Sequence, residues 1–160
     1  MLNKKLEKLS LLLAKKNYRL AVAESCTGGL LGAKITGLPG SSHYFSGGVI
    51  AYSNRIKTSL LGVEEKLLIS HGAVSKEVAE RMATGVRERF GVPFSISTTG
   101  IAGPGGGSEE KPVGLVYIGV SSPTGNEVVK NNFTGNRHQV REKTVNAALI
   151  LAINNLTHSS

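Results

Sequence analysis

In this 160-residue chain, residues 19–35 (RLAVAESCTGGLLGAKI) give the clearest indication of the fold. Its first six residues are mostly apolar, as in a buried strand, and they end at the small polar turn of residues 25–29. A second apolar stretch, residues 30–35, begins directly after the glycines and predicts a helix. Strand, tight glycine turn and helix make one β–α unit, so we expect a sheet whose strands are connected by helices.

The same alternation continues on both sides of this unit. Leucines at positions 2, 6, 9 and 13 recur at the spacing of one helical face and predict a surface helix that packs on the core. Apolar stretches predict further strands at 48–52, 92–99, 113–120 and 127–133. Asn54, Ser75 and Asn136 stand where further helices begin, and Asn54 and Ser75 are predicted to cap theirs.

A four-residue turn, PTGN at 123–126, separates the last two predicted strands. So short a connection joins only antiparallel neighbours, which makes the predicted sheet mixed. No internal repeat or linker divides the chain. The sequence therefore predicts an α/β fold: a single three-layer α/β/α domain over residues 1–160, with a mixed central sheet and helices on both faces.

Composition limits the partners. The 19 basic and 11 acidic residues leave a net charge of +8, which favours anionic ligands. Aromatic residues are only 5%, Trp is absent, and the basic residues are scattered, which argues against nucleic acid. A phosphate-bearing small molecule explains the sign of the charge equally well. Any nucleic-acid binding should weaken steeply with salt.

The chain also gives no sign of a membrane or secretory protein. No apolar run approaches the roughly 18–20 residues that span a bilayer, and the start does not have the pattern of a signal peptide. A single cysteine, Cys26, excludes an intramolecular disulfide. We expect a cytoplasmic protein without a membrane partner.

Two glycine-rich turns stand at predicted strand ends. Residues 103–107 (GPGGG) fit neither the P-loop pattern nor the dinucleotide fingerprint, because Pro112 and a strand follow where a helix should begin. A ligand-binding loop and a wide structural turn both remain open. The other turn is formed by residues 25–29, where consecutive N–H groups at a helix start make an anion or oxyanion site and Ser25 is placed as a nucleophile. A plain helix cap by Ser25 or Thr27 is the alternative, and spacing alone favours it.

A nucleophilic serine needs a base. Aspartate is absent, so an Asp–His–Ser triad is impossible, although a glutamate could take the place of the aspartate. The histidines are His43, His71, His138 and His158. A desolvated lysine is the other option: Lys57 lies one helical turn beyond the strand end at Tyr52, so both can face the Ser25 turn. Cys26 is a rival nucleophile, although from an extended backbone it points away from Ser25. No His pair has the spacing of metal ligands.

Four blocks of the sequence resemble a known family. They are AESCTGG at 23–29, YSNRIK at 52–57, HGAVS at 71–75 and TGIAGPGGGSEEKPVG at 99–114. In this order and spacing they closely resemble the C-terminal domain of the competence/damage-inducible protein CinA, from about residue 5 to 156. Stand-alone members of that family are nicotinamide-nucleotide amidases. The resemblance implies hydrolysis of nicotinamide mononucleotide to nicotinate mononucleotide and ammonia by a serine nucleophile, with no metal or cofactor.

The resemblance also implies roles for individual residues. Ser25 is expected to attack the amide carbon, Lys57 to act as base, and Tyr52 to be hydrogen-bonded nearby. The N–H groups of residues 27–29 are candidates for the oxyanion hole, Arg137 for the 5′-phosphate, and Tyr44 or Phe45 for covering the pyridine ring. The expected substrate-binding positions are Glu24, Thr27, Gly28, Gly29, Tyr44, Phe45, Thr99, Gly100, Ala102, Gly103 and Arg137.

Length marks a departure from the full-size relatives. Those carry an additional N-terminal domain with metal-dependent pyrophosphatase activity, for which this chain has no room, so we expect no ADP-ribose hydrolysis. Some relatives of this domain have lost the amidase, but all three expected catalytic residues are present here. A non-catalytic domain that binds a pyridine nucleotide is the alternative. A homodimer is expected because small α/β enzymes often form closed symmetric assemblies.

Overall fold

Five strands form one mixed sheet in the computed structural model, which describes residues 1–159. The strand order is β2-β1-β3-β4-β5. Strands β1, β2 and β3 are parallel, whereas β4 runs antiparallel to both β3 and β5. The mixed sheet is therefore confirmed. The bounds are β1 Leu20–Glu24, β2 Phe45–Ile50, β3 Phe94–Gly100, β4 Leu115–Ser122 and β5 Gly125–Asn132.

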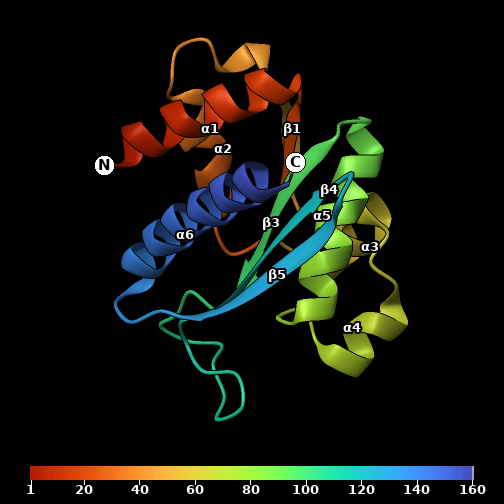
Figure 1. The fold of residues 1–160 in the computed structure, drawn as a ribbon. Helices are drawn as coiled ribbons and strands as arrows, with labels where there is room; N and C mark the ends of the chain where they lie inside the picture. The colour runs from red at the N-terminus through yellow and green to blue at the C-terminus, as the bar shows by residue number, and fades with distance from the viewer. Residues whose placement is uncertain (160) are drawn as a thin grey trace.

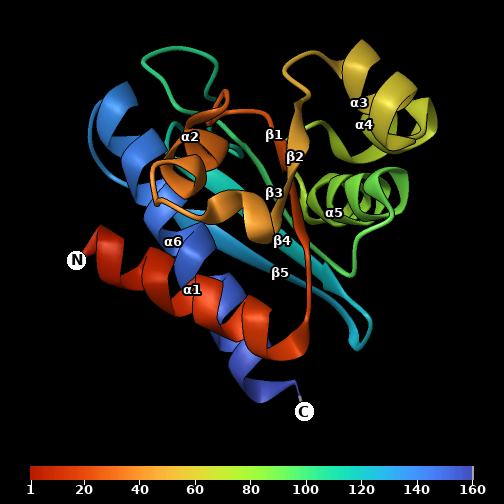
Figure 2. The ribbon, with the colours of Figure 1, turned by 90° about the horizontal axis from the view of Figure 1, so that it is seen from above.

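Helices cover both faces of the sheet, which confirms the three layers (Figure 1). Figure 2 shows α1, α2 and α6 on one side of the sheet and α3, α4 and α5 on the other. No helix in the described part of the chain combines the length and apolar character needed to cross a bilayer. The bounds are α1 Leu2–Lys16, α2 Leu30–Thr36, α3 Asn54–Leu61, α4 Glu65–His71, α5 Lys76–Phe90 and α6 Arg137–His158, with a short 3-10 helix at Ser41–His43.

Strand β1 is buried along its whole length and separates two hydrophobic cores. Leu20 and Val22 belong to the core under α1, α2 and α6, whereas Ala21 and Ala23 belong to the core under α3 and α5. This follows from the alternation of side chains along a strand. The same alternation decides what faces each side of the turn that follows β1.

The structure differs from the sequence prediction in three kinds of local detail. Helix α3 is capped by Ser53, whose hydroxyl accepts the Ile56 N–H, and not by Asn54, which is the first helical residue. Helix α4 was not predicted, because a segment of seven residues without one buried side chain gives little periodic signal. Strands β2, β3, β4 and β5 each begin two or three residues away from the predicted start.

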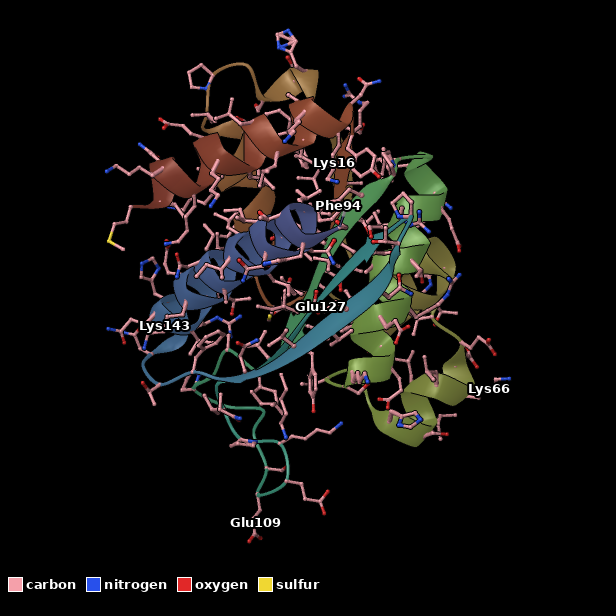
Figure 3. All side chains as sticks on the ribbon, in the orientation of Figure 1. Lys16, Lys66, Phe94, Glu109, Glu127 and Lys143 are labelled. Carbon is pink, nitrogen blue, oxygen red and sulfur yellow. The ribbon has the colours of Figure 1, made fainter. Side chains whose placement is uncertain are left out.

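The connection from β3 to β4 is an irregular loop, as its composition predicted. It projects from the body of the protein, with Glu109 at its tip (Figure 3). Its far end is attached to the neighbouring layer, because Lys111 Nζ donates a hydrogen bond to the His71 carbonyl at 2.5 Å. The loop therefore leaves the sheet at the edge where β1 and β3 both end.

Candidate active site

Ser25 directly follows β1 at the carboxyl edge of the parallel strands. Its N–H donates to the Thr98 carbonyl of β3 at 3.0 Å, so the backbone is held beyond the last strand residue. Alternation along β1 directs its side chain to the α3 side of the sheet. Ser25 does not cap α2. The N-cap residue is Gly29, which has no side chain to form a capping hydrogen bond. The sequence-based preference for a plain serine or threonine cap is therefore wrong.

Lys57 reaches Ser25 from helix α3. Its side chain is buried, with 2% of the residue exposed, and its Nζ lies 3.0 Å from the Ser25 Oγ. The same nitrogen donates to the Ala51 carbonyl at 2.9 Å and to the Tyr52 carbonyl at 3.4 Å. Burial lowers the pKa of the Lys57 ammonium below its ordinary value. Residues separated by 32 positions thus form a serine–lysine pair, as expected.

The two carbonyls give the Lys57 amine an orientation. A neutral amine has two N–H groups and one lone pair. The oxygens of Ala51 and Tyr52 accept hydrogen bonds and donate none. When both N–H groups are directed to these carbonyls, the lone pair faces the Ser25 hydroxyl. This is the arrangement in which an amine accepts the proton of a nucleophile.

Tyr52 lies beside this pair, although its hydroxyl contacts another group than the sequence suggested. Its hydroxyl oxygen accepts a hydrogen bond from Arg137 Nη2 at 2.9 Å, and Arg137 Nη1 donates to the Gly103 carbonyl at 2.8 Å. Lys57 is bound to the backbone of Tyr52, and no bond between Lys57 and the phenol is present in residues 1–159. The guanidinium therefore links the β2–α3 turn to the β3–β4 loop.

These side chains share a cavity of about 220 Å³. Of the residues predicted from the sequence, it brings together Ser25, Tyr52, Lys57, Thr99, Gly100, Ala102 and Arg137. It also includes residues that were not predicted to line it, namely Cys26, Asn54, Ala73 and Val74. Ala73 and Val74 belong to the HGAVS block, so the block was a usable signal although no single side chain in it suggests chemistry.

Glu24 lies behind the turn and not in the cavity. The residue is 2% exposed, and its carboxylate accepts four hydrogen bonds. The donors are the Thr27 hydroxyl at 2.6 Å and the N–H groups of Gly29, Leu31 and Gly32 at 3.2, 2.8 and 3.0 Å. The expected contact of the Glu24 and Thr27 side chains with substrate is therefore corrected. Alternation places Glu24 on the α2 side, where its carboxylate satisfies the first amides of that helix.

The oxyanion-hole candidates shift for the same reason. The Gly28 N–H donates to the Ser25 carbonyl at 3.0 Å, and the Gly29 N–H is taken by Glu24. Both glycines adopt left-handed φ angles, 58° and 102°, so their role here is to form the turn. Within residues 1–159, the N–H groups of Cys26 and Thr27 have no protein acceptor. Thr27 therefore stays a candidate, and Cys26 takes the place of Gly28 and Gly29.

Tyr44 and Phe45 lie at the opposite end of the sheet. Phe45 begins β2 and pairs with Leu20 at the start of β1, whereas the cavity is at the end of β1. Tyr44 is buried in the hydrophobic core, and Phe45 packs against that core. The expectation that either ring covers a substrate in this cavity is corrected. In parallel strands, the residues that begin β2 are separated from the carboxyl edge by the length of the strand.

Cys26 is not a second nucleophile. It belongs to the core on the α2 side, and burial raises the pKa of its thiol from 9.0 to about 12. A thiol with that pKa is protonated at neutral pH and reacts slowly. No group of three or more His, Cys, Asp or Glu within residues 1–159 has an arrangement that would hold a metal ion.

Arg141 is a further residue that the sequence analysis missed. It lies one helical turn after Arg137 on α6, and its Nη2 donates to the Thr27 carbonyl at 2.8 Å. The turn that carries Ser25 is thus attached to α6 as well as to β3. The half-buried Arg141 has no sequence signal that distinguishes it from the other polar residues of α6.

Comparison with known proteins agrees with this architecture. The family model described as the CinA C-terminal domain matches residues 2–156. A CinA-like protein from Acidobacterium capsulatum is 53% identical over 137 residues, which are 86% of this chain and 33% of that protein. A CinA-like protein from Desulfotalea psychrophila is 54% identical over 137 residues, again 86% and 33%. The chain thus spans about a third of the length of these curated relatives.

Solved structures are similar over nearly the whole chain. The competence/damage inducible protein CihA from Agrobacterium tumefaciens has a TM-score of 0.91 and 36% identity, with 96% of this chain and 95% of that chain covered. The competence damage-inducible protein A (ComA) from Klebsiella pneumoniae has a TM-score of 0.95 and 29% identity, with 99% of each chain covered. This chain belongs to the CinA C-terminal domain family.

Proposed function

We propose that this protein is a serine amidase that hydrolyses the carboxamide of nicotinamide mononucleotide to nicotinate mononucleotide and ammonia. The observation that carries the proposal is the contact of 3.0 Å between the buried Lys57 amine and the Ser25 hydroxyl. A serine nucleophile needs a base, and a lysine with a lowered pKa can supply it where no histidine is beside the serine. The family resemblance supplies the substrate.

The reaction begins when the Ser25 oxygen attacks the amide carbon and its proton passes to the Lys57 nitrogen. The tetrahedral oxyanion is stabilised by the free N–H groups of Cys26 and Thr27. The carbon–nitrogen bond then breaks, Lys57 returns the proton to the leaving nitrogen, and ammonia departs. This step leaves an ester between Ser25 and the nicotinoyl group. Water activated by Lys57 attacks the ester carbonyl, which releases the carboxylate and restores the serine.

Arg137 is the proposed partner of the substrate phosphate. Its guanidinium reaches the cavity and uses one N–H at Gly103 and one at Tyr52, which leaves other donors of its fork for an anion. Ala102 lines the same cavity, and its N–H group has no protein acceptor within residues 1–159. A net charge of +8 further favours an anionic substrate.

Ammonia release from nicotinamide mononucleotide tests the proposal. The purified protein is assayed in the presence of EDTA, beside Ser25→Ala and the control Ser10→Ala, which removes an exposed hydroxyl on α1. We expect release by the wild type and by Ser10→Ala, and none by Ser25→Ala, which should still bind the nucleotide. Binding without release by the wild type would replace the amidase with a nucleotide-binding domain. Equal release by Ser25→Ala would contradict the serine mechanism.

A further inference from the structure

Glu24 is a buried carboxylate with no basic partner side chain within residues 1–159. Its four hydrogen bonds come from one hydroxyl and three backbone amides, all of which are donors to it. Burying a carboxylate is unfavourable unless its hydrogen bonds are satisfied. Because Glu24 immediately precedes Ser25 in the chain, this arrangement is formed within the segment that carries the nucleophile.

Thr27 connects this carboxylate to the sheet. It is fully buried, and its hydroxyl lies 2.6 Å from Glu24 Oε1 and 2.8 Å from the Thr98 Oγ1 of β3. Since the carboxylate accepts, the Thr27 proton is directed to Glu24 and the Thr98 hydroxyl donates to Thr27. The backbone of the same residue 98 accepts the Ser25 N–H at 3.0 Å. The chain of bonds thus begins and ends beside Ser25.

We propose that Glu24, Thr27 and Thr98 form a positioning network for the nucleophile, and that its loss slows attack by Ser25 without weakening substrate binding. The three side chains fix the turn of residues 25–29 from behind, so that the Ser25 oxygen stays 3.0 Å from Lys57. Glu24 also accepts hydrogen bonds from the N–H groups of Gly29, Leu31 and Gly32. Of the N–H groups in this turn, those of Cys26 and Thr27 are therefore the ones left for a ligand. The proposal rests on the proposed function only in treating Ser25 as the attacking group.

The chemistry of the donors requires a carboxylate. Oε1 accepts three of the bonds and Oε2 accepts the Gly32 N–H. In Glu24→Gln, an amide that keeps its oxygen at the first position presents an NH2 group to the Gly32 N–H, so two donors face each other. Thr27→Val removes the link to Thr98 at nearly constant volume, and Thr27→Ser keeps it. The three variants therefore separate charge, hydroxyl and size.

The first measurement is steady-state hydrolysis of nicotinamide mononucleotide. Glu24→Gln and Thr27→Val should lower kcat by about 10- to 100-fold with KM little changed, because a small displacement of a reacting group is costly while the binding surface stays intact. Thr27→Ser should stay near the wild-type kcat. Matched controls are Glu127→Gln on β5 and Thr144→Val, a buried threonine of α6 that bonds only within its helix. Circular dichroism establishes that each variant is folded at the assay temperature.

The second measurement does not depend on the natural substrate. A phosphonofluoridate reacts with an activated serine: the bond between Ser25 oxygen and phosphorus forms, the phosphorus–fluorine bond breaks, fluoride leaves and the proton goes to Lys57. The rate of labelling, located by mass spectrometry, reports the nucleophile alone. Glu24→Gln and Thr27→Val should label slowly by a factor similar to their loss in kcat.

The outcomes separate the two proposals. Slow labelling of the variants supports the network even if the wild type releases no ammonia, in which case only the proposed substrate fails. Unchanged labelling and unchanged kcat in folded Glu24→Gln and Thr27→Val would refute the network and leave Glu24 as a cap of α2. A higher KM with an unchanged kcat in these variants would also refute the network, because Glu24 or Thr27 would then act on substrate binding.

Discussion

Replacing Lys57 with methionine gives the sharpest test of the serine–lysine pair. Methionine has a similar length and volume but no proton to accept or donate, so the base is lost while the space stays filled. Removing a general base lowers a rate by about 100- to 10,000-fold. Since Ser25 has no other basic side chain within hydrogen-bond distance in residues 1–159, we expect the upper part of that range for kcat/KM.

The same substitution should change the stability in a way that depends on pH. The pKa of Lys57 is lowered in the folded state from an ordinary value of 10.5, because burial disfavours its charge. Between the lowered pKa and 10.5 the unfolded chain binds a proton that the folded chain does not. The free energy of unfolding of the wild type therefore increases as pH rises through this window, by at most about 1.4 kcal/mol per pH unit for one group.

At neutral pH two effects of Lys57→Met oppose each other. The Ala51 carbonyl, in a residue with no exposed surface, loses its donor, which costs about 1–3 kcal/mol. The variant also avoids the cost of burying Lys57, which the wild type meets either by desolvating the ammonium or by losing a proton that the unfolded chain keeps. We therefore expect a variant that is inactive and yet not greatly destabilised, because the second effect offsets the first.

Urea denaturation at several pH values between 7 and 10, with ammonia release measured on the same samples, checks both parts. Lys66→Met is the matched control, because the Lys66 side chain is 82% exposed and pairs only with Glu64. The Cys26 thiol, whose pKa rises from 9.0 to about 12 on folding, also makes the stability depend on pH, so the difference between wild type and Lys57→Met is the informative quantity. A difference that does not change with pH, or a variant that keeps its activity, would refute the assignment of Lys57 as a buried base.

Three further predictions concern the surroundings of the pair. Arg137→Ala should raise KM for nicotinamide mononucleotide, and an unchanged KM in steady-state assays would remove this arginine from the phosphate site. Cys26→Ala should keep kcat near the wild-type value, and native Cys26 should resist iodoacetamide, since a thiol with a pKa of about 12 is protonated at neutral pH; rapid labelling would contradict this. Gly85→Ala should destabilise the fold by about 1–3 kcal/mol in thermal or urea denaturation, because a Cβ on α5 would lie 2.0 Å from the Leu61 carbonyl of α3. Because α3 carries Lys57, activity should fall with it, and a variant of wild-type stability would show that the two helices separate freely.

The fold class and the approach of Lys57 to Ser25 could both be predicted from the sequence alone. Apolar periodicity is a local property, so the strand of residues 20–24, the glycine turn and the leucine face of α1 follow from a few neighbouring residues. The absence of aspartate made lysine one of the possible bases, and Lys57 lies one helical turn beyond a strand end that meets the end of β1. Helix α4 gave no such signal because it buries no side chain.

Which backbone N–H groups remain free to bind a ligand depends on how the whole domain is packed. Glu24 and Ser25 are adjacent in the chain, and alternation sends them to opposite faces of the sheet, one to the amides of α2 and one to Lys57. The bond between Arg137 and Tyr52 joins residues 85 positions apart. Hydrogen bonds are exchanged between segments that approach each other only after folding. Which N–H groups find an acceptor in the protein, and which stay free as those of Cys26 and Thr27 do, therefore depends on the packing of the whole domain and not on any local pattern.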